Sequence, residues 1–149
     1  MLEKCVKADA IIIGTPVYFS YPTGVFRNFV ERLMFANHTY MVDKEKGGCK
    51  TQLNRTIPTG VIFTMNCPEE LSHKINYDVI LDENVKSLNH ILGYAEGLYA
   101  YDTYQFIDYS KYNCDLFDEK QKARTRDTQF PKDLGRAFNL GKKLIEMNK

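Results

Sequence analysis

The sequence predicts an α/β fold in which helices cover both faces of a parallel sheet. Residues 8–14 and 59–65 are short, continuously apolar and β-branched, which is typical of strands buried on both faces of such a sheet. Each is followed by a polar stretch that contains proline, and then by apolar residues at helical spacing. This alternation of strand, loop and helix favours a doubly wound sheet.

The first part of the chain is expected to hold one strand and one helix after the end of an earlier helix. Residues 2–7 are too short for a complete amphipathic helix and look like its last turns. After the strand at 8–14, the two prolines in residues 15–24 predict a loop. Thr23 has the residue type of an N-cap, and from Val25 onward apolar residues follow at helical spacing.

The middle of the chain repeats this pattern after a long connection. Residues 37–58 have no clear period, which predicts a mostly exposed excursion before the strand at 59–65. The spacing of leucine and valine predicts a helix over 77–92, which Gly93 ends. The aromatic-rich segment 98–106 is expected to form a third strand, more exposed than the others.

The C-terminal part is expected to be helical. Residues 120–126 include four basic side chains and are interpreted as a solvated helix face, although a contact with the phosphates of a pyridine nucleotide stays open. Pro131 suits the first turn of a last helix. The residues that this helix is expected to bury are Leu134, Ala137, Phe138, Gly141, Leu144 and Ile145.

Composition excludes several classes of protein. The 149 residues are 44% hydrophobic and 26% charged, as expected for one soluble domain over residues 1–149. A formal net charge of +1 gives no support for nucleic-acid binding. No apolar run approaches the roughly 20 residues of a membrane-spanning helix, and the first residues lack a secretory signal, so we expect a cytoplasmic protein. The four cysteines form no Cys-x-x-Cys pair and the histidines are isolated, so we expect reduced thiols and no metal site.

Two neighbouring segments carry a resemblance to a known family. Residues 8–19 end in Thr15-Pro16-Val17-Tyr18-Phe19, and residues 24–33 end in Glu-Arg-Leu. This strand, Thr-Pro-x-Tyr loop and helix closely resemble the flavodoxin-like NAD(P)H-dependent FMN reductases and iron–sulfur flavoproteins. The resemblance implies a flavodoxin-like domain and an FMN-dependent oxidoreductase of the flavin or quinone reductase type. Its electron donor would be NAD(P)H and its electron acceptor a small molecule.

The resemblance also implies which residues surround the flavin ring. They are Thr15, Pro16, Val17, Tyr18, Phe19 and Gly24 on one side of the ring, and Thr64, Met65 and Asn66 on the other. Backbone N–H groups can stabilise the negative charge of a reduced flavin, and an aromatic side chain can stack on the ring. The residues alone leave a plainer interpretation open, in which the aromatics cover the rim of the sheet and residues 64–66 form a polar turn. No catalytic acid or base is expected, because the cofactor performs the chemistry.

The chain departs from the family in its number of strands. A complete flavodoxin-like sheet has five strands, and the loop after the first of them cradles the FMN phosphate. We expect about three core strands here, and therefore a domain truncated at its N-terminus that lacks this loop and the cysteine cluster of the iron–sulfur subset. The strand at 8–14 would then be an open sheet edge, which we expect a second copy of the chain to cover as a homo-oligomer. Two alternatives stay open: a truncated, non-catalytic paralogue acting as an oligomerisation or interaction module, and an electron-transfer flavodoxin.

Overall fold

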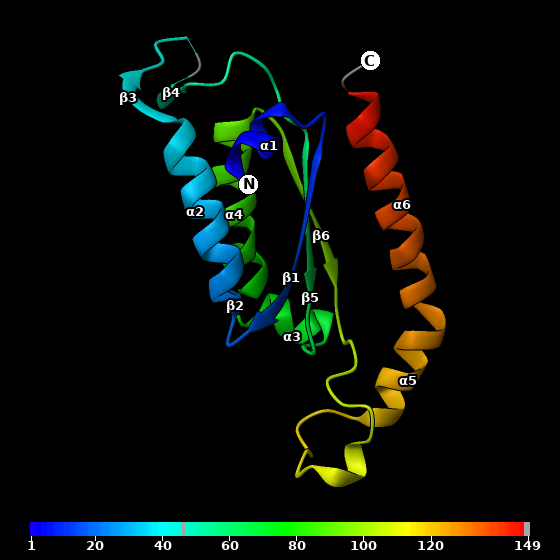
Figure 1. Ribbon diagram of the computed structural model, residues 1–149. Helices are drawn as coiled ribbons and strands as arrows, with labels where there is room; N and C mark the ends of the chain where they lie inside the picture. The colour runs from blue at the N-terminus through cyan, green and yellow to red at the C-terminus, as the bar shows by residue number, and fades with distance from the viewer. Residues whose placement is uncertain (46, 148–149) are drawn as a thin grey trace.

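Three parallel strands form the centre of the molecule. The computed structural model describes residues 1–45 and 47–147 (Figure 1). Its main sheet has the order β2-β1-β5-β6, in which β1 (Ile11–Tyr18), β5 (Thr59–Thr64) and β6 (Ala95–Ala100) run parallel. The fourth strand, β2 (Tyr21–Pro22), pairs antiparallel with the end of β1. The expected parallel α/β sheet of flavodoxin-like type is therefore confirmed.

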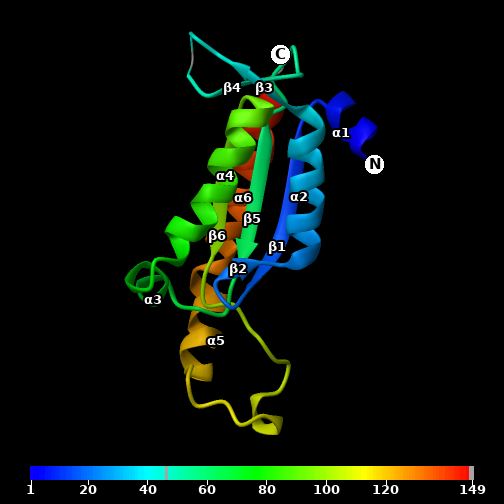
Figure 2. The same ribbon diagram turned by 90° about the vertical axis from the view of Figure 1, so that its left-hand side faces the viewer.

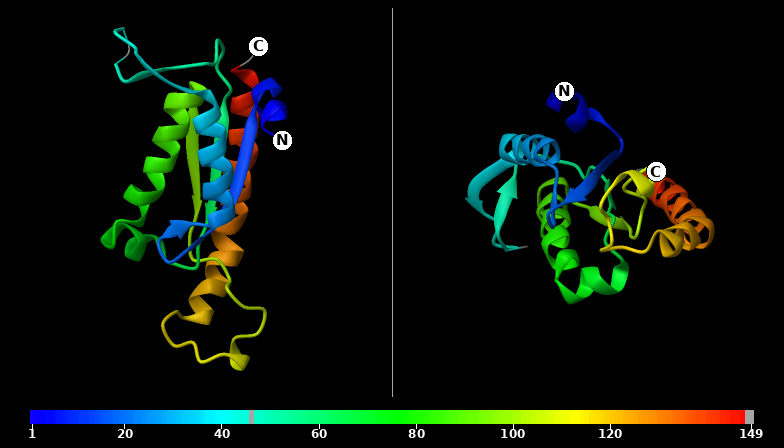
Figure 3. Two further views of the ribbon diagram at one scale, coloured as in Figure 1. Left: turned by 60° about the vertical axis from the view of Figure 1, so that its left-hand side comes forward. Right: turned by 90° about the horizontal axis from the view of Figure 1, so that it is seen from below.

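Helices lie on both faces of this sheet. α2 (Gly24–Asn37) and α4 (Tyr77–Leu92) cover one face, and α6 (Phe130–Glu146) covers the other (Figures 2 and 3). The shorter helices are α1 (Leu2–Lys7), α3 (Glu69–Lys74) and α5 (Glu119–Thr128). The larger core lies between β5 and the α2–α4 pair and includes Val30, Phe63 and Leu88, none of which is exposed. Among the described residues, no helix combines the length and the apolar character needed to cross a bilayer.

The expected helix ends agree with the structure. The Thr23 hydroxyl accepts a hydrogen bond from the Phe26 N–H at 3.3 Å, which makes Thr23 the N-cap of α2. α4 has the bounds expected from its apolar spacing and ends at Gly93, whose φ of 87° places it in the left-handed region. Pro131 lies in the first turn of α6, where its missing N–H costs no helical hydrogen bond.

The expected loop at residues 15–24 is wrong, because β1 continues through Pro16 to Tyr18. The Ile11 N–H donates to the Pro58 carbonyl on the β5 side. Since N–H groups alternate between the two sides of a strand, the Pro16 nitrogen faces the opposite, open side of β1. A proline there removes no hydrogen bond from the β1–β5 ladder.

Two expectations of burial on the α6 face are also wrong. β5 is buried on both faces, but β1 is not, since Ile12 on its α6 face is 52% exposed. Of the side chains that α6 was expected to bury, Leu144 is buried, whereas Leu134, Phe138 and Ile145 are exposed. The reason is the same in both cases. α6 packs on β5 and β6. Beyond β1 the described residues place only the two-residue strand β2, which pairs with Val17 and Tyr18 and leaves Ile12 and the outer side of the helix uncovered.

The third strand ends earlier than the aromatic pattern predicted. β6 stops at Ala100, and a long loop with one 3₁₀ turn (Tyr109–Lys111) leads to α5. Asp102 has a φ of 54°, and the N–H groups of Asp102 and Thr103 donate to the carbonyls of Cys67 and Met65. The segment after β6 is therefore bound to the segment after β5, although it no longer forms a regular strand.

The connection at residues 37–58 contains a small second sheet that its lack of period did not reveal. β3 (His38–Val42) pairs antiparallel with β4 (Cys49–Thr51). Only two residue pairs are in register, and β3 is mostly exposed, so the expectation of an exposed excursion holds in part.

Candidate functional site

The carboxyl ends of the three parallel strands lie at one end of the sheet. This is where ligands of open α/β sheets bind, in the crevice that the loops after the strands form. Here the loops begin after Tyr18, Thr64 and Ala100, at the lower end of Figure 1. The expected flavin residues lie on the first two of these loops and the strand ends before them.

The sheet register brings two of the expected residues together. Pro16 is paired with Thr64 across the β1–β5 ladder, so the two residues are neighbours on the same face of the sheet. Tyr18 follows two residues after Pro16 on this face and is 54% exposed. Proline, threonine and tyrosine thus line one surface at the carboxyl end of β1 and β5.

A tight hairpin turn places a second aromatic residue beside Tyr18. Phe19 and Ser20 connect β1 to β2, and both have positive φ angles, of 50° and 74°. Hairpin turns with two such residues favour asparagine and glycine, because other side chains cost roughly 1–2 kcal/mol each in this conformation. Phe19 nevertheless occupies the turn and is 96% exposed. Phe19 therefore combines a strained backbone conformation with a solvent-exposed aromatic ring.

Other expected residues of this loop face inward. Thr15 is buried, and its hydroxyl oxygen accepts from the Thr23 N–H at 3.2 Å and lies 3.2 Å from the Thr23 hydroxyl. Val17 is half-buried against the core, and Gly24 is the exposed first residue of α2. The side chain of Thr15 therefore ties β1 to the start of α2. Since N–H groups alternate along a strand, those of residues 15 and 17 lie on the same side as that of Ile11, toward β5, and not toward a ligand.

The end of β5 contributes three further expected residues with different surroundings. Met65 is buried, and its sulfur accepts a weak hydrogen bond from the Ser72 hydroxyl at 3.9 Å. Thr64 is half-buried on the α6 face. The Asn66 carbonyl oxygen accepts from Lys122, whereas the side-chain oxygen Oδ1 of Asn66 is buried without a hydrogen-bond partner among the described residues.

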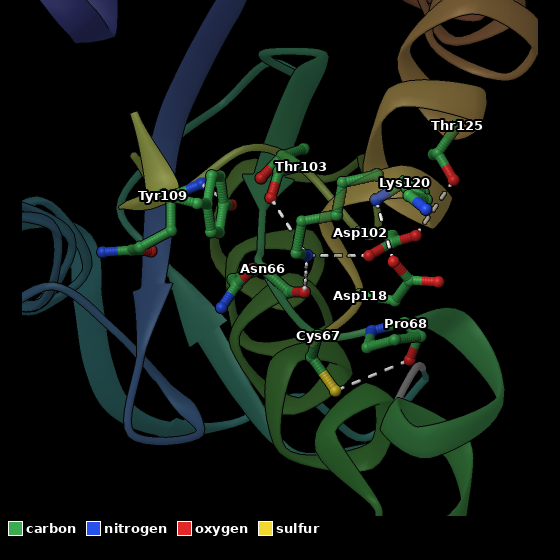
Figure 4. Close-up of polar contacts among 11 residues, drawn as sticks. Asn66, Cys67, Pro68, Asp102, Thr103, Tyr109, Asp118, Lys120 and Thr125 are labelled. Carbon is green, nitrogen blue, oxygen red and sulfur yellow. Dashed lines mark hydrogen bonds and ion pairs between the residues drawn. The ribbon is translucent and has the colours of Figure 1, made fainter. Parts of the chain in front are cut away.

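A buried lysine connects the two loops that follow β5 and β6. Its partners Asn66, Asp102 and Thr103 are labelled in Figure 4. The Lys122 Nζ donates to Asp102 Oδ1 at 2.7 Å, to the Asn66 carbonyl at 2.7 Å and to the Thr103 carbonyl at 3.3 Å. The second Asp102 oxygen accepts from the Thr125 hydroxyl at 2.9 Å. One ammonium group thus binds both loops to α5.

The expectation that residues 120–126 form a solvated helix face is therefore wrong for Lys122, which has no exposed surface. The sequence contained no signal for this burial, because the whole of α5 is polar and no apolar stripe marks its inner face. The pair also acts on its neighbour Cys67. Burial raises the pKa of that thiol, and the nearby Lys122 charge only partly opposes this effect.

The residues present fit a flavin ring in part. Tyr18 and Phe19 offer aromatic faces, Pro16 and Thr64 form an adjoining surface, and the unpartnered Oδ1 of Asn66 can accept a hydrogen bond from a ring N–H. The side chains of Thr15 and Met65 do not fit this role, since both are used inside the protein. Among residues 1–45 and 47–147, no group of histidine, cysteine or acidic side chains could hold a metal ion.

Comparison with known proteins agrees with the resemblance drawn from the motif. Residues 1–48 match the family model of NADPH-dependent FMN reductase. An iron–sulfur flavoprotein of Archaeoglobus fulgidus is 50% identical over 36 residues, which are 24% of this chain and 18% of that protein. The match thus spans less than a fifth of the relative's length.

A solved structure shares the fold. A thermophilic tryptophan halogenase (Th-Hal) from Streptomycin violaceusniger superimposes with a TM-score of 0.52 and 15% sequence identity, over 89% of this chain and 70% of that chain. At this level of identity the likeness concerns the fold alone. The sequence likeness instead lies in the segment that forms β1, the strained turn and α2. In its first 48 residues the chain thus carries the sequence pattern of the NADPH-dependent FMN reductase family.

Proposed function

We propose that this protein is an FMN-dependent oxidoreductase that takes electrons from NAD(P)H and passes them to a small-molecule acceptor. The observation that carries the proposal is the strained turn at Phe19 and Ser20, which holds two exposed aromatic side chains beside Pro16 and Thr64. The turn lies at the carboxyl end of the sheet and within the residues that match the reductase family. The four unpaired cysteines agree with a cytoplasmic location, which we include in the proposal.

In this proposal the chain binds and orients the ring. Tyr18 and Phe19 would cover a face of the ring, Pro16 and Thr64 would support its edge, and Asn66 would bind a polar ring atom. Thr15, Val17 and Met65 would support these residues from inside the protein, since the Met65 N–H already donates to the Ala100 carbonyl, and Gly24 at the start of α2 completes the expected set. FMN, when bound, supplies the hydride and electron transfer, so no side chain is assigned as an acid or base.

A titration of FMN fluorescence by the purified chain tests this function. We expect quenching at micromolar protein, and oxidation of NADH or NADPH that depends on added FMN. Phe19→Ala should weaken FMN binding, because it removes an aromatic face worth about 0.5–1.5 kcal/mol, or roughly two- to tenfold. Phe35→Ala is the matched control, since Phe35 is also exposed but lies on α2. Equal affinity of both variants, or no quenching by the native chain, would reject the proposal.

A second function is favoured by the open side of β1. We propose as the alternative that the chain is a non-catalytic module that associates with a second copy of itself through this edge. The edge carries Ile12 beside an apolar groove formed with α6, whose lining includes Phe138 and Ile145. This alternative predicts a colourless oligomer without FMN-dependent consumption of NADH or NADPH. The reductase proposal is compatible with the same association, so turnover is what separates the two.

A further inference from the structure

A cavity of about 330 Å³ lies between the carboxyl ends of β5 and β6 and the helices α5 and α6. It is distinct from the exposed turn at Phe19, although Thr64 contributes to both surfaces. Its volume is at the lower end of the range of small-molecule sites, roughly 300–1,000 Å³, and suits a single ring with its substituents.

One uncompensated positive charge lines this cavity. The charge of Lys122 is neutralised by Asp102, and the carboxylate of Asp133 accepts hydrogen bonds from Gln129 at 2.8 Å and Arg136 at 3.1 Å. Arg126 also lines the cavity and has no carboxylate partner within the described part of the chain. Its guanidinium carbon lies 5.5 Å from the ring centre of Tyr104. The guanidinium is therefore held by an aromatic ring, and its N–H donors remain available to an anion.

The walls of the cavity are aromatic. Tyr101, Tyr104 and Phe130 line it, and the ring of Tyr104 packs on that of Tyr109 with centroids 5.9 Å apart. Tyr104 and Phe130 are partly exposed, which leaves ring surface for a ligand to cover. Thr64, Thr103 and Thr125 also line the cavity. The hydroxyl groups of threonine can bind polar substituents, although that of Thr125 already donates to Asp102.

We propose that this cavity binds a planar aromatic molecule that carries one anionic group. The ring of the ligand packs against Tyr104 and Phe130, and its anion accepts hydrogen bonds from Arg126. Binding of this kind needs no flavin, so the inference extends beyond the proposed redox function. Because Thr64 is shared, a molecule in the cavity lies next to the surface proposed for the flavin ring.

Isothermal titration calorimetry of the FMN-free chain with 4-hydroxybenzoate tests the proposal. We expect saturable binding with one site per chain. The uncharged analogue 4-hydroxybenzyl alcohol and the non-aromatic anion cyclohexanecarboxylate should each bind at least about tenfold more weakly, since each lacks one of the two recognised features. No binding of 4-hydroxybenzoate at millimolar concentration, or equal binding of all three compounds, would overturn the inference.

Two pairs of variants locate the site. Arg126→Met should weaken 4-hydroxybenzoate binding about tenfold or more, whereas Arg124→Met on the same helix should leave it unchanged, since Arg124 is exposed and outside the cavity. Tyr104→Leu should weaken binding, and Tyr40→Leu on the exposed strand β3 should not. Unchanged affinity in Arg126→Met and Tyr104→Leu would refute the assignment. If 4-hydroxybenzoate binds as expected but FMN does not, only the reductase proposal fails.

Discussion

The side chain of Lys122 shows how much a single buried charge can contribute to the arrangement of a site. Lys122→Met should lower the free energy of unfolding by about 3–5 kcal/mol, because Asp102 would keep a buried charge without its partner. Lys120→Met, on the exposed side of the same helix, should change it by less than about 0.5 kcal/mol. Urea unfolding followed by circular dichroism measures both. The double variant Asp102→Asn/Lys122→Met should recover part of the stability that Lys122→Met loses, which would confirm the coupling. If Lys122→Met lowered the free energy of unfolding no more than Lys120→Met does, the coupling would be contradicted.

Two tyrosines on β6 and just after it make stability sensitive to alkaline pH. Burial, followed by the negative charge of Glu69 and Asp78, raises the pKa of Tyr101 to about 12. Burial and a hydrogen bond to Asp82 raise the pKa of Tyr99 still further. A raised pKa in the folded state means stability that is fully present below the unfolded pKa, near 10, and is lost as pH rises from about 10 to about 12.

The corresponding measurement is urea unfolding of the native chain and of Tyr101→Phe at several pH values between 8 and 12. Lysines titrate in the same range, so the difference between the two proteins isolates the contribution of Tyr101. We expect the stability of the native chain to fall more steeply above pH 10 than that of Tyr101→Phe. If stability fell equally with pH in both proteins, Tyr101 would have the same pKa in the folded and unfolded states, and the prediction would be wrong.

At the scale of elements, two glycines test how tightly α6 packs on the sheet. A Cβ at Gly60 on β5 would lie 3.1 Å from a methyl group of Leu140 and 3.2 Å from one of Leu144, both buried side chains of α6. Gly60→Ala should therefore destabilise the protein by about 1–3 kcal/mol. Gly135→Ala, in α6 with no atom within 4 Å of the new methyl group, should stabilise it by roughly 0.5–1 kcal/mol. Thermal unfolding that shifts in the same direction for both variants would disprove this packing argument.

Helices were predictable from sequence to the extent that their own residues determine them. The apolar spacing and Gly93 gave the right bounds for α4, and Thr23 marked the start of α2. The ends of the strands depended on distant contacts instead. Pro16 stays in β1 because its nitrogen faces an open edge, and β6 ends at Ala100 because the following N–H groups bind the carbonyls of residues 65 and 67. No local pattern in the sequence reports either contact.

The candidate site was predictable only as a set of segments. The motif pointed to residues 15–19 and 64–66, and the register of the sheet places Pro16 beside Thr64. The motif alone could not show that Thr15 points inward to Thr23, since a threonine at a strand end suits either orientation. Lys122 was missed because its partners, the carbonyls of residues 66 and 103 and the carboxylate of Asp102, come from loops far away in the chain.

At the scale of the whole molecule, the exposed side of β1 predicts association with a second copy of the chain. Ile12, Phe138 and Ile145 leave apolar surface exposed along one edge of the sheet. We expect sedimentation velocity to show a dimer at micromolar concentration, and Ile12→Lys to shift it toward monomer by placing a charge in the contact. Val79→Lys, at an equally exposed apolar position on α4, should not have this effect. A native chain that stays monomeric throughout would contradict the association.

The turn at Phe19 and Ser20 costs the folded chain stability that another pair of residues would keep. Asparagine and glycine would close the same hairpin with less strain. The hairpin therefore gives up stability at the one corner where the ring of Phe19 lies in water.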